Sequence, residues 1–464
     1  MVSNMAQNTT VANDELMQAT PRRVGESIRL FQDLGEKGRH FNELFQKFKQ
    51  RYFSLKEHEK ERLFMAIIQQ IEVPKTEIEP YLTALIKCEP DDAQWPVLLT
   101  RMRAQFRSPR LKIFQKISYA SGGLKFLLDF RGDLLTVQRY STLDLTPLDA
   151  DIIFLFDMWF QEGFLYLEEI TLDSAYNQIA LIKDSDMVHP MASIEEMGRR
   201  LGKDRRCFAL YHRFLPREPI VFIEVALTKG LAKKVSEVMA GAGVRSAREK
   251  ADTAIFYSIN NTQNGLAGLG LGKMLIGKVV DSLKKENDKI KNFATLSPVP
   301  GFWKSYLRPL LEGKDDKFSL KHTDVISLFS KKSAAKILER VDESTSDPKL
   351  FNKALISILS DDAWVKNPDL KKRLQSPMVK IAYHYIASEK NPRQKPLNPV
   401  ANFHLGNGAT VSERNINFLA NSSSRGLKES CGIMVNYVYS SHWLGQLRRT
   451  FRWFDKMEIK GLFR

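Results

Sequence analysis

The stretch AIFYSINNTQNGLAGLGLGKMLIGKVVDSLKKENDKIKNFATLSPVPG, from Ala254 to Gly301, decides the fold. Its beginning belongs to an apolar segment, Ala251 to Ile259, whose aromatic and β-branched residues predict a strand. The glycine-rich segment Asn261 to Lys273 follows, and apolar residues then recur at helical spacing. A second apolar segment, Phe293 to Leu296, predicts another strand. The order is therefore strand, glycine turn, helix and strand, which is typical of an α/β domain.

The glycine turn is suited to binding phosphate, because a turn that opens a helix presents free backbone N–H groups and the positive end of the helix dipole. Gly268-x-Gly270-x-Gly272 lacks the spacing of the dinucleotide fingerprint, and Lys273 is followed by Met274 where a P-loop has Ser or Thr. The turn resembles the pyrophosphate loop of the acetyltransferase-like (GNAT) superfamily, although Ala267 stands where Gln or Arg is expected. A purely structural turn is the alternative.

Several longer motifs support a more specific resemblance. They occur in this order: His-Pro-Met (189–191), Arg-Arg-Cys-Phe-Ala-Leu-Tyr-His-Arg (205–213), Phe-Tyr-Ser-Ile (256–259), Thr-Leu-Ser-Pro-Val-Pro-Gly-Phe (295–302), Val-Ala-Asn-Phe-His-Leu-Gly-Asn-Gly-Ala (400–409) and Ser-Cys-Gly-Ile-Met-Val-Asn-Tyr (430–437). Together they resemble the malonyl-CoA decarboxylase family. The resemblance covers Leu172 to Tyr439 closely and the N-terminal part loosely.

The resemblance implies an enzyme that converts malonyl-CoA to acetyl-CoA and CO2 through a thioester enolate. Ser297 and His404 match the family's catalytic pair and are expected to contact substrate, and Tyr437 matches a tyrosine near the site. Ser258 matches a serine beside the glycine turn. Backbone N–H groups of the turn should bind the pyrophosphate and pantetheine of CoA. The turn residues are Ala267, Gly268, Leu269, Gly270, Leu271, Gly272 and Lys273.

The chemistry of these residue types suits the reaction. An enolate needs hydrogen-bond donors at its oxygen and then a proton on carbon, which a serine and a histidine can supply. Which of the two is the immediate donor stays open. Gly270 stands where some relatives have a glutamate. The roles expected of Ser297 and His404 do not depend on that carboxylate. No metal, biotin or pyridoxal motif is present, and no cofactor is expected beyond the CoA of substrate and product.

The predicted fold class is multidomain, with an N-terminal helical bundle followed by a GNAT-like mixed-sheet α/β catalytic domain. Residues 1–20 are predicted to be a disordered tail, 21–157 a helical bundle for oligomerisation, and 158–464 the catalytic domain. Residues 308–399 read as a helical insertion within that domain. The family resemblance implies a homo-oligomer, a tetramer, assembled through the helical domain.

Local patterns place the remaining elements. Strands are predicted at Tyr166–Thr171, Arg206–Tyr211 and Ile220–Leu227, with Leu215–Pro219 as a hairpin connection. Two further strands are predicted near the C-terminus, one containing Asn402-Phe403-His404 and one over Cys431–Tyr439, and the tail Trp443–Phe463 reads as a basic amphipathic helix. In the bundle, Phe41, Leu44, Phe45, Phe48 and Tyr52 form one apolar stripe. Trp95, Leu98, Leu99, Met102 and Phe106 form a second.

Composition limits the alternatives. The 464 residues carry a formal net charge of +16, spread along the chain, which suits a polyanion such as CoA without indicating nucleic acid or a membrane as partner. Three distant cysteines argue for a reducing compartment. Without a secretory signal, a C-terminal Ser-Lys-Leu or a convincing transit peptide, a cytoplasmic location is expected. The alternatives are a CoA-dependent acyltransferase of the GNAT superfamily and a basic scaffold or nucleic-acid-binding protein.

Overall fold

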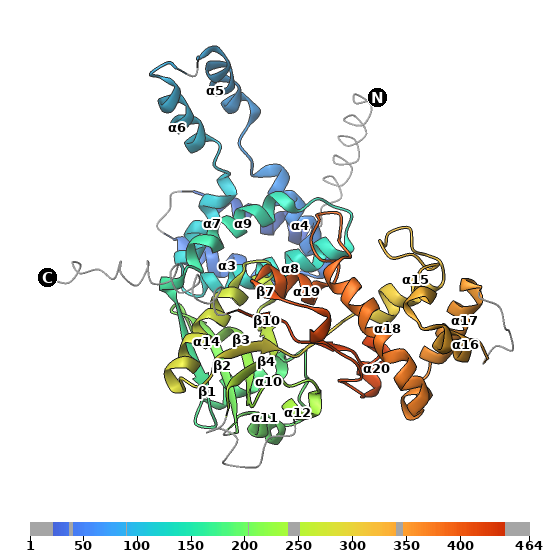
Figure 1. Cartoon of the computed structure of the whole chain (residues 1–464). Coiled ribbons are helices and arrows are strands. Elements are labelled where there is room, and N and C mark those ends of the chain that lie inside the picture. The colour runs from blue at the N-terminus through green and yellow to red at the C-terminus, as the bar shows by residue number, and fades with distance from the viewer. Residues whose placement is uncertain are drawn as a thin grey trace. The chain divides into compact units, whose positions relative to one another are not determined.

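The computed structural model describes residues 22–36, 40–89, 91–202, 204–239, 251–339 and 347–440. The chain divides into two compact units (Figure 1). The first, which we call the helical unit, contains residues 1–166, 211–220 and 261–270. The second, the sheet unit, contains residues 167–210, 221–260 and 271–464. The predicted tail at residues 1–20 and the predicted helix at Trp443–Phe463 lie outside the described residues.

Aromatic side chains build the core of the helical unit. Its helices are α2 (Arg22–Asp33), α3 (Phe41–Phe53), α4 (Glu57–Gln70), α5 (Lys75–Lys87), α6 (Trp95–Gln105), α7 (Pro109–Tyr119), α8 (Gly123–Tyr140) and α9 (Thr146–Trp159). Phe45, Phe48 and Tyr52 of the first predicted stripe are buried and contact Phe126 of α8 edge-on. Residues at helical spacing thus form one buried face, as amphipathic helices require.

Helices α5 and α6 differ from the rest of the helical unit. They pack against each other, yet neither has a buried residue. Ile86 is 85% exposed and Val97 is 49% exposed. The second predicted stripe is therefore helical, but within a single chain it forms no core.

A mixed sheet dominates the sheet unit. Its strand order is β1-β2-β3-β4-β5-β10-β7, and a separate three-stranded sheet has the order β6-β9-β8. The strands are β1 (Leu165–Ile170), β2 (Arg205–His212), β3 (Leu215–Thr228), β4 (Thr253–Asn261), β5 (Asn292–Thr295), β6 (Ser297–Pro298), β7 (Ala409–Thr410), β8 (Ile416–Asn417), β9 (Met434–Val435) and β10 (Val438–Tyr439). β4 and β5 are parallel, whereas β10 is antiparallel to both β5 and β7.

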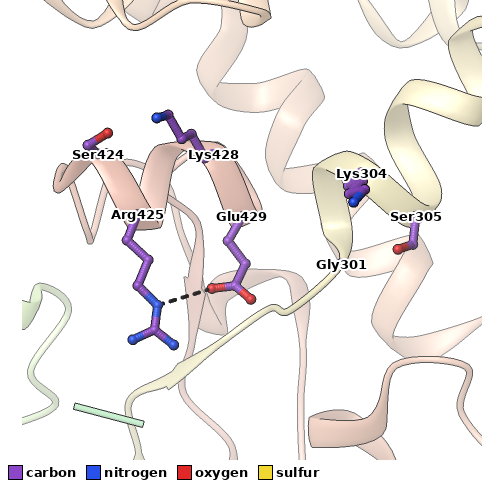
Figure 2. A pocket seen from close by; sticks show the side chains of 7 residues that line it. All are labelled: Gly301, Lys304, Ser305, Ser424, Arg425, Lys428 and Glu429. Carbon is purple, nitrogen blue, oxygen red and sulfur yellow. Dashed lines mark ion pairs between the residues drawn. The ribbon is translucent and has the colours of Figure 1, made fainter. Parts of the chain in front are cut away.

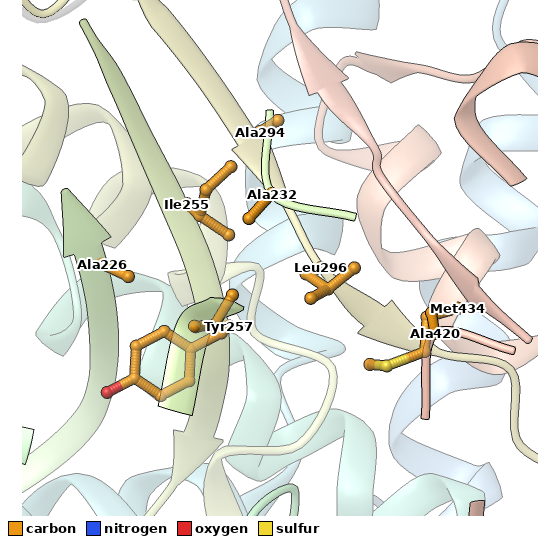
Figure 3. Packing of buried hydrophobic residues seen from close by; sticks show 9 residues of the cluster. Ala226, Ala232, Ile255, Tyr257, Ala294, Leu296, Ala420 and Met434 are labelled. Carbon is orange, nitrogen blue, oxygen red and sulfur yellow. The ribbon is translucent and has the colours of Figure 1, made fainter. Parts of the chain in front are cut away.

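Small and branched side chains hold the centre of this sheet together (Figure 3). Ile255 and Tyr257 of β4 pack with Ala294 and Leu296 at β5, and Met434 of β9 joins the same cluster. Because β4 and β5 have no polar face exposed here, they read in the sequence as continuous apolar runs. This cluster therefore packs around β4 and β5, and β5 is the strand that immediately precedes Ser297 and β6.

Helices surround the sheets. They are α10 (Tyr176–Ser185), α11 (Ile194–Arg200), α12 (Val235–Met239), α14 (Leu271–Glu286), the π-helix η3 (Phe302–Leu307), α15 (Arg308–Leu311), α16 (Lys331–Leu338), α17 (Pro348–Leu359), α18 (Pro368–Ala387), α19 (Pro399–Gly406) and α20 (Ser424–Ser430). The fold-class prediction, a helical region followed by a mixed-sheet α/β region, is confirmed. No described helix is long and apolar enough to cross a membrane.

Three local predictions are wrong. Asn402-Phe403-His404 lies in helix α19, because Asn398 accepts a hydrogen bond from the Ala401 N–H and Pro399 occupies the first turn. Leu215–Pro219 begins strand β3, so the hairpin turn is only the two residues after His212. The run Cys431–Tyr439 forms two short strands, β9 and β10, that belong to different sheets.

Candidate active site

Ser297 and His404 lie side by side although 107 positions separate them in the sequence. The Ser297 Oγ is 3.1 Å from the His404 Nε2, and both residues are buried, with exposed fractions of 6% and 5%. Ser297 is supplied by β6 and His404 by α19. A serine and histidine in hydrogen-bond contact within a buried site form the arrangement expected for proton transfer.

Two further side chains extend this pair into a chain of four groups. The His404 Nδ1 is 3.0 Å from the Tyr439 hydroxyl, and Ser297 Oγ is 2.9 Å from Thr295 Oγ1. Each hydroxyl has one proton and each neutral imidazole has one N–H. The four groups can therefore donate their hydrogen bonds in either direction along the series. Reversing that direction moves the imidazole proton between Nδ1 and Nε2. This geometry suits a proton relay.

Burial determines the charge of the histidine. Loss of solvent lowers the pKa of His404 to about 3, because the protonated imidazole is the form that water stabilises. The imidazole is therefore neutral at neutral pH. Burial also raises the pKa of Tyr437 and of Tyr439 far above the usual value for a phenol, so both hydroxyls keep their protons.

Tyr437 contacts His404 of the serine–histidine pair through its ring. Its ring stacks on the imidazole of His404, with ring centroids 4.7 Å apart. Its hydroxyl is buried and has no hydrogen-bond partner among the described residues. Leaving a buried hydroxyl without a hydrogen-bond partner costs about 1–3 kcal/mol of stability, so this hydroxyl is a candidate donor to a bound substrate.

Backbone pairing and two asparagines hold the pair in place. Ser297 is paired with Val435 of β9, two residues before Tyr437. Asn398 caps α19 with its side-chain oxygen and donates from Nδ2 to the carbonyl of Pro300, 3.1 Å away. Asn436 donates to the carbonyl of Thr295 at 2.7 Å. These bonds connect the segments that carry the serine, the histidine and the tyrosines.

The predicted phosphate turn lies at the start of α14. Gly268 and Gly270 have positive φ angles of 84° and 69°, a backbone conformation that favours glycine. Gly272 is required for a different reason: a Cβ there would lie 2.4 Å from the ring of Phe403. Phe403 precedes His404 in α19, so the first turn of α14 packs against the residue next to His404.

The beginning of this turn is held within the helical unit. Arg131 of α8 donates from Nη1 to the carbonyls of Gly265 and Ala267, at 2.5 and 2.8 Å, and pairs with Asp149 at 2.7 Å. A Cβ at Gly265 would lie 2.1 Å from the carbonyl oxygen of Leu128. This glycine therefore permits the turn to pack against α8.

Ser258 lies in a separate buried network. Its hydroxyl donates to Asp186 at 2.8 Å and accepts from Asn260 at 2.7 Å, and its exposed fraction is 1%. Arg200 pairs with both Asp186 and Glu224, at 2.9 and 3.2 Å. Neither Ser297 nor His404 is among the hydrogen-bond partners of Ser258.

Tyr439, Thr295 and Phe403 also belong to this site and were not predicted from the sequence. A signal existed for the first two: Tyr439 is two residues after Tyr437, and Thr295 is two residues before Ser297, the spacing that puts side chains on one face of a strand. Phe403 offered no such signal, because its neighbour Gly272 is distant in sequence. No group of three or more His, Cys, Asp and Glu side chains that could hold a metal occurs in the described part of the chain.

Comparisons with known proteins show which family the chain belongs to. The family model of the malonyl-CoA decarboxylase C-terminal domain matches residues 163–452, and the model of the N-terminal domain matches residues 76–160. The mitochondrial malonyl-CoA decarboxylase of Anser anser anser is 36% identical over 340 residues, which are 72% of this chain and 64% of that protein. The chain spans 64 to 65% of the length of the curated relatives that it matches.

Solved structures extend the similarity over nearly the whole chain. The crystal structure of malonyl-CoA decarboxylase from Rhodopseudomonas palustris has a TM-score of 0.74 and 29% identity, and covers 96% of this chain and 99% of that one. The enzyme from Agrobacterium vitis has a TM-score of 0.76 and 26% identity, with 92% and 95% covered. The chain belongs to the malonyl-CoA decarboxylase family.

Proposed function

We propose that this protein decarboxylates malonyl-CoA to acetyl-CoA and CO2. One observation carries the proposal: the chain of hydrogen-bonding groups Tyr439, His404, Ser297 and Thr295 is buried beside the unpartnered hydroxyl of Tyr437. A proton relay next to a free donor is what the reaction requires. Membership of the family supports the same reaction.

The proposed reaction has two steps. The bond between the carboxylate carbon and Cα of the malonyl group breaks, CO2 leaves, and the electron pair moves into the thioester as an enolate. The Tyr437 hydroxyl donates a hydrogen bond to the enolate oxygen. Ser297 then gives its proton to Cα, His404 returns a proton to Ser297, and solvent restores the proton of the relay. A neutral imidazole suffices here because the enolate carbon is a much stronger base than the histidine.

The glycine turn is the proposed CoA site. Gly268 and Gly270 leave the backbone open on the exposed side of the turn, and no atom lies within 4 Å of a Cβ built at either residue. Free N–H groups at the start of the 16-residue helix α14 favour pyrophosphate oxygens, and the exposed Lys273 adds a positive charge. The reaction as proposed uses only groups of the chain and the CoA of the substrate.

Product analysis tests the proposal. Purified protein is incubated with malonyl-CoA in the presence of EDTA, and acetyl-CoA and CO2 are measured together. Equal amounts of both products support the decarboxylase. Acetyl transfer to an added amine without CO2 release indicates the acyltransferase alternative. If the protein neither decarboxylates malonyl-CoA nor transfers acetyl to the amine, and if it binds nucleic acid in a salt-dependent way, the scaffold alternative is indicated.

We also propose self-association through the helical domain, with the tetramer that the family resemblance implies. The support is the pair of helices α5 and α6, which expose Ile86 and Val97 and have no buried residue. Light scattering on wild type and on Ile86→Glu/Val97→Glu tests it, with a smaller particle expected for the variant. If the variant has the same particle mass as wild type, the surface around Ile86 and Val97 takes no part in self-association. The cytoplasmic location stays a prediction, and so do the absences of nucleic acid and membrane as partners.

A further inference from the structure

A cavity of about 600 Å³ lies between the π-helix η3 and helix α20 in the sheet unit (Figure 2). Gly301 and Lys304 line one wall, and Arg425 and Lys428 line the other. Ser305 and Ser424 add a hydroxyl on each wall. No residue of the catalytic chain of hydrogen bonds lines this cavity, so it is separate from the pair.

The charges around the cavity are not balanced. Among the residues that the structure describes, Glu429 is the only carboxylate that lines the cavity, and it pairs with Arg425 at 3.7 Å. Lys304 and Lys428 form no ion pair with any described residue, although they line the same space. Cations gathered around a concave surface raise the local potential and attract anions. The remaining positive charge and the two hydroxyls are the groups that phosphate and carboxylate oxygens bind.

We propose that this cavity binds a small anion carrying two or more phosphate or carboxylate groups. One anionic group would lie between Lys304 and Lys428, since these two cations come from opposite walls. Another would take hydrogen bonds from Ser305 or Ser424, with Arg425 turning from Glu429 toward the ligand. A singly charged ion would fill little of the volume and would use only part of this charge.

Such a ligand would act on the catalytic pair, and this part of the inference rests on the proposed function. One wall, η3, begins within a few residues of Ser297, since only the segment Pro298 to Gly301 separates them. The other wall, α20, is followed by β9, which pairs with β6 through Val435 and Ser297. An anion that draws the two walls together therefore changes the spacing of the strands that carry the catalytic serine, so kcat should change.

Calorimetric titration tests the binding directly, and it does not depend on enzyme activity. Inorganic pyrophosphate and citrate are titrated separately into the full chain at constant ionic strength, and their relative affinity distinguishes phosphate from carboxylate ligands. The test variant is Lys304→Ala/Lys428→Ala. The matched control is Lys372→Ala/Lys380→Ala, which removes two exposed lysines from α18 and so has the same net charge.

One saturable site is expected in wild type for at least one probe, with affinity at least about tenfold lower in the test variant and unchanged in the control. Binding that is equal in all three proteins, or absent from wild type, overturns the proposal. Loss of binding in the presence of saturating acetyl-CoA also overturns it, because the anion would then occupy the CoA site. Steady-state kinetics with malonyl-CoA tests the coupling: the probe should change kcat in wild type and in the control but not in the test variant, and an unchanged kcat in wild type refutes that part.

Discussion

The ring of Tyr437 lies over the imidazole of His404, with centroids 4.7 Å apart and an angle of 25° between the planes. The hydroxyl of the same tyrosine is buried and has no partner among the described residues. We therefore propose two separable roles for this side chain: the ring fixes the plane of the imidazole, and the hydroxyl donates a hydrogen bond to the substrate.

Tyr437→Phe separates these roles, because it keeps the ring and removes only the hydroxyl. The expected kcat is lower by on the order of 100-fold, the usual cost of one oxyanion donor, with little change in KM. The melting temperature should not fall, since the lost hydroxyl made no hydrogen bond. Tyr257→Phe is the matched control: its hydroxyl is also buried and unpartnered but lies elsewhere. Equal kcat in the two variants would contradict the proposed donor.

Gly272→Ala should disturb the histidine through Phe403. The added methyl would lie 2.4 Å from the Phe403 ring, so the ring must move, and it precedes His404 on α19. The expected results are a lower kcat and a loss of stability of about 1–3 kcal/mol, typical of overpacking. Adding Phe403→Leu should restore part of both in the double variant. If the double variant is no better than Gly272→Ala alone, Phe403 does not transmit the effect.

The titration of His404 should lie far below the usual range. Burial lowers its pKa in the folded protein to about 3, against about 6.5 in the unfolded chain. The unfolded chain therefore binds more protons between these values, so this group's contribution to stability is complete above about pH 6.5 and is lost as the pH falls toward 3. Two-dimensional NMR of the imidazoles, with His404→Asn to identify the signal, should show no protonation of His404 above pH 5. A midpoint between pH 6 and 7 would contradict the neutral relay.

Glu224 should produce the opposite dependence of stability on pH. Burial, together with the neighbouring carboxylate of Asp186, raises its pKa to about 8. A raised value means that the folded state binds more protons between about pH 4.5 and 8, so stability falls as the pH rises through this window. Glu224→Gln removes the titration. The variant and wild type should be similarly stable near pH 4.5, and the advantage of the variant should grow by about 1.4 kcal/mol per pH unit up to pH 8 and stay constant above it, which melting temperatures measured from pH 4.5 to 9 would show. If the melting temperatures of wild type and Glu224→Gln depend on pH in the same way, Glu224 does not titrate between pH 4.5 and 8.

The sequence predicted the elements whose signals are local and regular. The strand, turn, helix and strand around Gly268 were found because apolar periodicity and glycines mark them directly. His404 was predicted on a strand but lies on a helix, since Asn398 and Pro399 begin α19 and no long apolar repeat follows. Phe403 could not be predicted, because only folding brings it against Gly272. The short strands and the packing of distant residues depend on tertiary structure, whereas the start of α19 at Asn398 and Pro399 is a local signal that the strand prediction overlooked.

The proposed catalytic roles of Ser297 and His404 can be tested against a second serine and histidine of the same chain. Ser319 Oγ is 2.8 Å from His384 Nε2, so these residues form a similar hydrogen bond outside the candidate site. Ser319→Ala and His384→Asn are therefore matched controls for Ser297→Ala and His404→Asn. Circular dichroism and melting temperature establish that each variant is folded.

The most direct measurement is the rate of acetyl-CoA and CO2 formation from malonyl-CoA by these four variants and wild type. The account predicts that Ser297→Ala and His404→Asn each lose at least about 100-fold in kcat, as expected for removal of a general acid or base, while the two controls retain the wild-type rate. Folded Ser297→Ala and His404→Asn proteins that work as fast as wild type would contradict the account.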